Sequence, residues 1–287
     1  MSEHRYPVHG AGLGLRRDHL EALRDGIPQE IDFMEVAPEN WLGIGGHLKK
    51  QFADIASRVP VALHGLSLSI GSPAPLDENL VRQIKHFMDE HHCPVYTEHL
   101  SYCSDDGHLY DLMPIPFTEE AVHYVAERIR RVQDILERRI AMENVSYYAA
   151  PGQKLDELTF INAVIEEADC DLHLDVNNIY VNSINHVYEP EEFLRGLPGE
   201  RIVYCHVAGH YTEDEDLLVD THGSDVIDPV WALLEKAYEQ FGVFPTLLER
   251  DFNIPPLETL LDEVRIIRSL QTKWQNHHAQ HPVAAHA

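Results

Sequence analysis

Residues 118–144, TEEAVHYVAERIRRVQDILERRIAMEN, predict an amphipathic helix followed by a short apolar strand. Thr118 and the two glutamates after it make an acidic helix start, and several arginines fall late, as the helix dipole favours. The strand, at 140–144, carries an acid, Glu143, near its end. A helix that leads into such a strand is the repeating part of an α/β fold, and similar units lie on both sides of it.

The alternation of strand and helix extends over most of the 287 residues. Helical periodicity is clearest at 76–91, 118–138, 229–241 and 257–270, and shorter helices are predicted near 18–25 and 190–194. The predicted strands lie at 12–15, 33–36, 61–64, 95–99, 140–144, 172–175, 202–207 and 246–250. These units predict one (β/α)8 TIM barrel of the α/β class over residues 1–272, followed by a disordered histidine-rich tail at 273–287.

Most of these strands end in an acidic or imidazole side chain. The residues concerned are His64, His99, Glu143, Asp175, His206 and Glu249. Because the C-terminal ends of barrel strands converge on one mouth, these side chains should meet there. Asp220 and His222 follow in a D-x-H pair, whose side chains point the same way in an extended chain. Burying each charge costs several kcal/mol unless a cation compensates, so the set predicts a metal centre.

The donor types narrow the choice of metal. Carboxylates and imidazoles without a thiolate suit iron, manganese or zinc better than copper(I) or an iron–sulfur cluster. The four cysteines form no C-x-x-C pair and are expected to be reduced thiols in the core. The ligands outnumber what one ion takes, so two or three ions that share carboxylates fit better, with Glu143 as the natural bridge.

Charge and hydropathy exclude several classes of partner. The 48 acidic and 22 basic residues give a formal net charge of −26, which disfavours nucleic acid and anionic membrane surfaces. The first residues lack the basic region and apolar core of a signal peptide, and no apolar run approaches membrane-spanning length. We therefore expect a cytoplasmic protein that binds neither nucleic acid nor membrane.

Residues beside these strand ends have other interpretations. Glu35 and Glu39 are equally compatible with support of the site, contact with substrate, or a helix cap or surface pair. Glu98 is expected to face the helix layer and to pair with a basic residue. His173 is expected to be structural, and His210 is expected to line the entrance.

The chain resembles a known family through segments spread from about Gly10 to Leu270. They are GAGLGLR, DFMEVAPENW, ALHGLSLSIG, YTEHLSY, MENVSYY, LDVNNIYVNSINH, HVAGH, DTHG and LLERD. The spaced D-V-N-N and D-T-H-G blocks make the likeness specific. It is to the multinuclear non-heme iron-dependent oxidases, formerly catalogued as a domain of unknown function.

This resemblance implies a barrel related to xylose isomerase that holds two or three iron ions in mixed Fe2+/Fe3+ states. It also implies that dioxygen is used to modify cysteine residues of a ribosomally synthesised precursor peptide. A small partner protein that binds the leader of this peptide is expected as well. The product of the modification stays open.

The family's ligand set can be carried over residue by residue. One iron position takes His64, His99 and Glu143, and a second takes Asp175, His206 and Glu249, with Glu143 shared. The third takes Asp220 and His222 and is completed by Asn178, where the wider superfamily has an imidazole, or by His186. Asn177 and Glu39 are further candidates for a ligand or supporting role, and catalytic roles are expected for Glu143, His64 and Asp175.

Two other enzyme classes remain open. One is a multinuclear metal hydrolase like endonuclease IV, although the net charge of −26 is unsuited to DNA. The other is an enzyme like the sugar isomerases, although the predicted mouth contains no lysine. A metal-binding module without catalysis is a third alternative. The identity of the bound metal discriminates among them.

Overall fold

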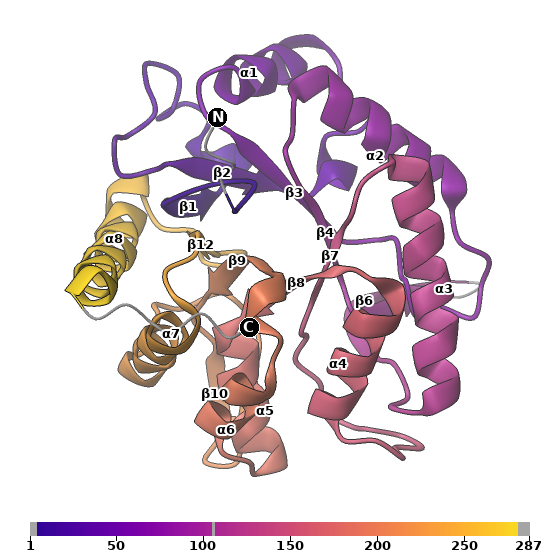
Figure 1. Cartoon of the computed structure of the whole chain (residues 1–287). Helices are drawn as coiled ribbons and strands as arrows, with labels where there is room; N and C mark the ends of the chain where they lie inside the picture. The colour runs from indigo at the N-terminus through magenta and orange to yellow at the C-terminus, as the bar shows by residue number, and fades with distance from the viewer. Residues whose placement is uncertain (1–4, 105–106, 281–287) are drawn as a thin grey trace.

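The computed structural model, which describes residues 5–104 and 107–280, contains a closed barrel of parallel strands (Figure 1). Neighbouring strands follow the order β1-β12-β9-β8-β7-β4-β3-β2. Their bounds are β1 Ala11–Gly14, β2 Phe33–Val36, β3 Val61–Gly65, β4 Tyr96–His99, β7 Ala141–Glu143, β8 Asp171–Asp175, β9 Ile202–Val207 and β12 Thr246–Leu248. The predicted barrel and all of its predicted strands are confirmed.

Helices surround the barrel. They are α1 Gly46–Ala56, α2 Glu78–His91, α3 Glu119–Leu136, α4 Glu157–Ala168, α5 Val176–His186, α6 Pro190–Gly196, α7 Asp228–Phe241 and α8 Leu257–Gln280. Local sequence sets their ends: Thr118 accepts a hydrogen bond from the Ala121 amide at the start of α3, and Glu137 adopts a left-handed conformation after its end. The buried residues of α3 recur at helical spacing, from Val122 to Leu136, and pack in the main core.

Two expectations about local structure are wrong. The segment near 18–25 forms a short 3-10 helix at Arg17–His19 and turns instead of an α-helix. The last helix does not end near Leu270 but continues to Gln280, so residues 273–280 are helical instead of disordered. Trp274 is buried against the main core, and a ring nitrogen of His278 lies 2.8 Å from the Tyr238 carbonyl oxygen, which anchors this extension. The rest of the predicted tail, 281–287, lies outside the described residues.

The barrel interior is layered. Its apolar layer includes Phe33, Ala62, Tyr204 and Leu247 from four strands, together with Val95 just before β4. Because side chains on one face of a strand recur every second residue, the next inward layer is polar. It contains Glu35, His64, Thr97, His206 and Glu249. A packed apolar layer therefore supports the polar mouth from below.

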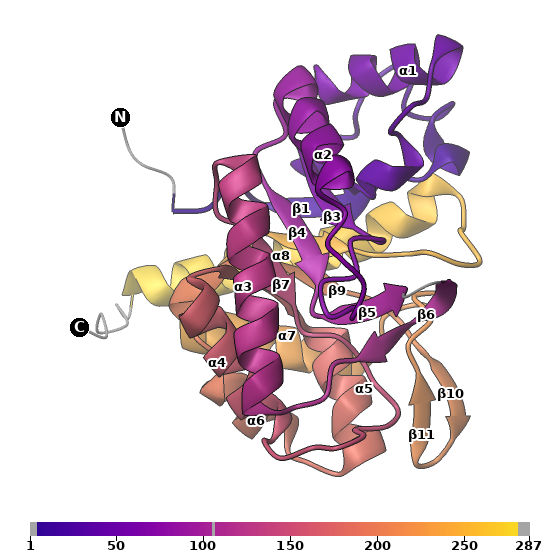
Figure 2. The same cartoon turned by 90° about the vertical axis from the view of Figure 1, so that its right-hand side faces the viewer.

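Two hairpins extend beyond the barrel at the same end. One pairs β5 Ser101–Ser104 with β6 His108–Pro114, and the other pairs β10 Tyr211–Asp214 with β11 Leu217–Val219. Figure 2 shows both hairpins on one side of the barrel. Since each follows the C-terminal end of a barrel strand, β4 or β9, they flank the mouth.

The buried carboxyl of Glu157 should make stability depend on pH. Burial raises the pKa of Glu157 to about 8, although Asn182 donates a hydrogen bond to it. Between the ordinary pKa and about 8 the folded protein therefore holds a proton that the unfolded chain has lost, so stability falls as pH rises through this window. The slope from one such group is at most about 1.4 kcal/mol per pH unit. Urea unfolding of metal-free protein at pH 5 to 8 should show a flatter decline for Glu157→Gln than for wild type, and parallel curves would refute this assignment.

Candidate metal centre

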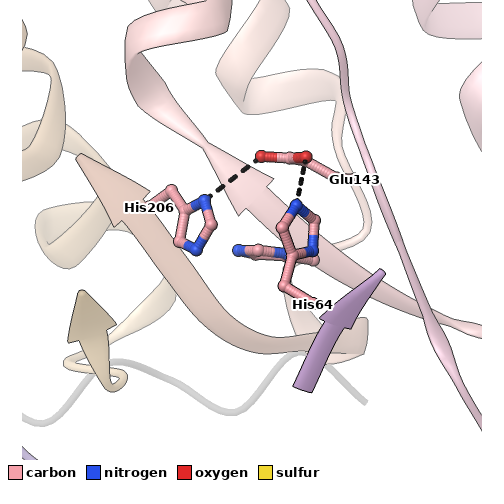
Figure 3. Close-up of side chains that lie close together, drawn as sticks. His64, Glu143 and His206 are labelled. Carbon is pink, nitrogen blue, oxygen red and sulfur yellow. Dashed lines mark ion pairs between the residues drawn. The ribbon is translucent and has the colours of Figure 1, made fainter. Parts of the chain in front are cut away.

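The carboxylate of Glu143, at the end of β7, lies between imidazoles from other strands (Figure 3). Its Oε2 is 3.2 Å from Nε2 of His64 and 3.2 Å from Nε2 of His99, and these two nitrogens are 3.1 Å apart. Its Oε1 lies 3.3 Å from Nδ1 of His206. The two oxygens of Glu143 therefore face two different groups of donors, as a bridging carboxylate requires.

The first group consists of His64 and His99. The ring nitrogens that face away from Glu143, Nδ1 in both residues, fix the orientation of the two imidazoles. His99 Nδ1 lies 2.8 Å from the Gly65 carbonyl oxygen, which only accepts hydrogen bonds. Nδ1 of neutral His99 must carry the proton, so Nε2 presents its lone pair to the mouth. His64 Nδ1 lies 2.7 Å from the Thr97 hydroxyl, which leaves its Nε2 facing His99 and Glu143.

The second group centres on His206. Its Nδ1 lies 2.9 Å from Glu249 Oε2 and 4.0 Å from Asp175 Oδ2. On the other side of the ring, Nε2 is 2.8 Å from Glu35 Oε2, and Tyr204 donates a hydrogen bond to the same oxygen. Of the interpretations of Glu35, the structure therefore favours support of the site: its carboxylate holds the imidazole of His206 so that Nδ1 faces the acids.

The third group lies in the loop after β11. His222 Nε2 is 2.7 Å from Asp220 Oδ1, and His222 Nδ1 lies 3.2 Å from Glu249 Oε2 and 3.1 Å from Asp251 Oδ2. Glu249 thus lies between the second group and the third. The sequence interpretation missed Asp251, although it follows Glu249 at the same spacing of two that joins Asp220 to His222.

The start of α5 places two asparagines differently. The side chain of Asp175 caps this helix by accepting a hydrogen bond from the backbone N–H of Asn178 at 2.6 Å. The side-chain nitrogen of Asn178 donates to the Asn144 carbonyl, and its Oδ1 is buried without a hydrogen-bond partner in the described part of the chain. The side-chain nitrogen of Asn177 donates a hydrogen bond to Asp220 Oδ1 at 2.9 Å, and its Oδ1 lies 2.8 Å from His210 Nδ1. Asn178 thus offers a free oxygen, while Asn177 positions Asp220.

Three sequence-derived candidates lie away from this cluster. His186, at the far end of α5, stacks on the Tyr147 ring and lies 2.8 Å from the Tyr147 carbonyl oxygen, so it is not brought to the third group. Glu39 accepts hydrogen bonds from the Leu66 and Ser67 amides and holds the loop after β3. Glu98 accepts a hydrogen bond from the Tyr96 hydroxyl, so the expectation that it pairs with a basic residue is wrong.

Unpaired polar atoms test whether the mouth fits a cation. The buried atoms without a hydrogen-bond partner in residues 5–104 and 107–280 include Glu143 Oε2, Asp175 Oδ2, Asn178 Oδ1, His206 Nδ1, His222 Nε2 and Glu249 Oε2. Native proteins rarely leave such atoms unpaired. Among them, His206 Nδ1 lies 2.9 Å from Glu249 Oε2 and 4.0 Å from Asp175 Oδ2 without a hydrogen bond to either atom. This arrangement fits cations held among the groups.

The whole barrel matches one family model, over residues 10–272, described as RiPP precursor modification enzyme MbnB/TglH/ChrH. The chain belongs to this family. RiPPs are ribosomally synthesised and post-translationally modified peptides, so this family member is an enzyme of peptide modification. Within the described residues, no helix is long and apolar enough to cross a membrane.

The chain is also similar to sequence relatives and, in its fold, to solved structures. A UPF0276 protein of Nitrosospira multiformis is 63% identical over 91% of this chain and 93% of the relative. A UPF0276 protein of Pseudomonas aeruginosa is 54% identical over 93% of this chain and 94% of its own length. An L-ribulose 3-epimerase structure has a TM-score of 0.60 at 15% identity, covering 98% of this chain and 99% of its own. A xylose isomerase domain protein from Planctomyces limnophilus has a TM-score of 0.59 at 14% identity, with coverages of 94% and 99%. At such identities the structures show only the shared xylose-isomerase-like barrel.

In this MbnB/TglH/ChrH family member, the close charges at the mouth shift the pKa values of its acidic and imidazole side chains. Burial opposes ionisation of Glu143, but the charges of His64 and His99 outweigh it and hold its pKa well below the usual value. Burial and the neighbouring Glu143 raise the pKa of Asp175 well above its usual value. Despite burial, Glu143 raises the pKa of His64 to about 9. Without a cation the mouth therefore retains protons, and metal binding should release them.

Proposed function

We propose that this enzyme is a multinuclear iron-dependent oxidase that uses dioxygen to modify cysteine residues of a ribosomally synthesised precursor peptide. The observation that carries the proposal is the position of Glu143, whose two oxygens face separate groups of histidine and carboxylate donors. Membership of a family of RiPP precursor modification enzymes supports the peptide substrate. We infer two or three ions of mixed Fe2+/Fe3+ state.

The residues of the mouth divide among the proposed positions. His64, His99 and Glu143 would hold the first ion, and Asp175, His206 and Glu249 would hold the second with Glu143. Asp220, His222 and Asn178 would hold the third, because Asn178 has a free buried oxygen and His186 lies elsewhere. Bound iron would supply a site for the substrate thiolate and the means to reduce dioxygen.

The protein's own contribution is to hold these donors in place. Glu35 orients His206, and the Gly65 carbonyl orients His99. Asn177 and Ser146 both donate hydrogen bonds to Asp220, which restrains the loop of the third group. The proposed catalytic roles of Glu143, His64 and Asp175 are to keep adjacent ions close and to present them to the mouth.

A surface for the leader-binding partner is proposed beside the mouth. Large apolar side chains are exposed on both hairpins and on the loop after β12: Leu109, Met113, Tyr211, Leu217 and Phe252. Exposed apolar residues gathered around a functional opening are typical of interaction sites. A small partner bound there would bring the precursor peptide to the metal centre.

The proposed reaction should require both oxygen and a thiol. Iron-loaded enzyme, partner protein and the precursor peptide encoded beside it are incubated in air. We expect a change in peptide mass and the loss of an alkylatable thiol. The anaerobic reaction and a peptide with Cys→Ser are the controls and should not react. Equal turnover without oxygen would contradict the oxidase.

Metal analysis of anaerobically purified protein discriminates among the enzyme classes. We expect roughly two to three irons per chain, from the number of donors such ions need. Zinc would favour a hydrolase like endonuclease IV, and magnesium or manganese would favour an enzyme like the sugar isomerases. At most one tightly bound ion would exclude the multinuclear site.

A further inference from the structure

His173 lies on β8 inside the barrel, fully buried, in direct contact with the metal centre described above. Its ring centroid lies 4.0 Å from that of His206, 4.2 Å from that of Tyr204 and 4.9 Å from that of His64. Neither Nδ1 nor Nε2 of His173 has a hydrogen-bond partner in the described part of the chain. This histidine is therefore surrounded by the site, yet none of the assigned roles uses it.

Strand geometry explains why His173 faces the site. Residues two apart on a strand share a face, so His173 points inward like Asp175, about 6–7 Å deeper along β8. The outward positions Leu172 and Leu174 pack in the main core instead. His173, expected from the sequence to be structural, therefore faces the same interior as Asp175.

A purely structural role fits His173 poorly. A buried imidazole in a packing role normally donates its N–H to a neighbour, because an unpaired buried donor costs free energy. The nearest hydroxyl-bearing ring, that of Tyr204, already donates to Glu35 and contacts the Thr97 hydroxyl. An apolar side chain would fill this layer without an unpaired donor.

The neighbouring donor atoms supply the missing role. One ligand atom from each of His64, Glu143, His173 and His206 lies within 4.8 Å of the others. Donors that share one ion at about 2.0–2.2 Å lie at most about 4.4 Å apart, so a shift of a few tenths of an ångström lets donors up to 4.8 Å apart share an ion. We propose that His173 is a further metal ligand, which binds the ion held by His64 and Glu143 from the interior side of the barrel.

This inference rests on the proposed metal centre and deepens it. A donor from the interior takes a coordination position that faces away from the mouth. The positions that face the mouth then stay available to the substrate. His173 would thus help to determine which coordination positions of the ion remain free for substrate.

The test compares His173→Leu with wild type and with His186→Leu, a control that removes a histidine outside the cluster. Metal-free proteins are titrated anaerobically with Co2+, whose visible absorption reports ligand number and type, and Fe2+ stoichiometry is measured separately. We expect His173→Leu to bind one ion at least about tenfold more weakly and to change the Co2+ spectrum. Thermal melts of the metal-free proteins should show no loss of stability, because the variant removes an unpaired buried donor.

The outcomes separate this inference from the proposed function. If wild type binds several ions and His173→Leu binds them with the same affinity and spectrum, His173 is only a packing residue and the inference fails alone. If wild type binds no Co2+ or Fe2+, the metal centre itself fails. His173→Gln, which keeps a donor atom, serves as a second variant and should bind with intermediate affinity. Affinity equal to wild type in that variant, together with an unchanged spectrum, would likewise reject a ligand role.

Discussion

Glu143→Gln is expected to lose most of the bound metal while the barrel stays folded. The two oxygens of Glu143 face separate donor groups, one containing His64 and His99 and the other containing His206. An amide has one oxygen, and its NH2 group would face nitrogens or a cation on the other side. Both bridged positions should therefore weaken together. Elemental analysis should show the loss, and circular dichroism should show native secondary structure.

Glu157→Gln is the matched control for this experiment. Glu157 is also buried, but it lies at the start of α4 and accepts its hydrogen bond from Asn182. Its replacement should leave metal content unchanged. Full metal occupancy in Glu143→Gln, or equal loss in both variants, would refute Glu143 as the bridge.

Gly209→Ala is expected to lower stability strongly and to disturb the third donor group. A Cβ at residue 209 would lie 2.1 Å from the Ser224 carbonyl oxygen and 2.6 Å from that of Asp225. These atoms belong to the backbone, so no side chain can rotate away. Overpacking of this kind costs about 1–3 kcal/mol or more. The melting temperature should fall by several degrees, at about 2–4 °C per kcal/mol.

The loop displaced by Gly209→Ala begins just after His222, so the loss of metal should be greatest at the third position. Gly26→Ala provides the control, because a Cβ there meets nothing within 4 Å. A melting temperature for Gly209→Ala within about 1 °C of the control would show that the backbone at Gly209 and the backbone at Ser224 and Asp225 can move apart at little cost. Our account of the close packing would then be wrong.

The sequence carried enough local information to predict the barrel and most of the polar cluster at its mouth. Apolar runs of strand length, helical periodicity and helix caps such as Thr118 act over a few residues, so they can be recognised without the fold. The strand-end residues His64, His99, Glu143 and His206 meet in the structure, because parallel strands in a barrel bring their C-terminal ends together.

Residues beyond or below the strand ends were harder to place. The sequence left Asn178 and His186 as alternatives for the third group, but α5 is a continuous helix. Eight residues along a helix span about 12 Å, so Asn178 and His186 lie too far apart for both to reach the third group. His186 instead contacts the Tyr147 carbonyl oxygen. The hairpins β5–β6 and β10–β11, which flank the mouth, were not predicted, because β10 is exposed throughout and β5 has only two buried positions, so neither carries the apolar run that marks a barrel strand.

The sequence by itself thus determined the fold class and which acidic and imidazole side chains meet at the strand ends, since these follow from local pattern and from one topological rule. Only the tertiary structure decided which polar atoms are left unpaired. Contacts with residues far away in the chain made His173 and Asp251 candidates, turned His186 toward Tyr147 and turned Glu39 toward the loop after β3. The physical reason is that a ligand is defined by the direction of its lone pair relative to other donors. That direction is set by packing and hydrogen bonds, which no residue type or spacing specifies.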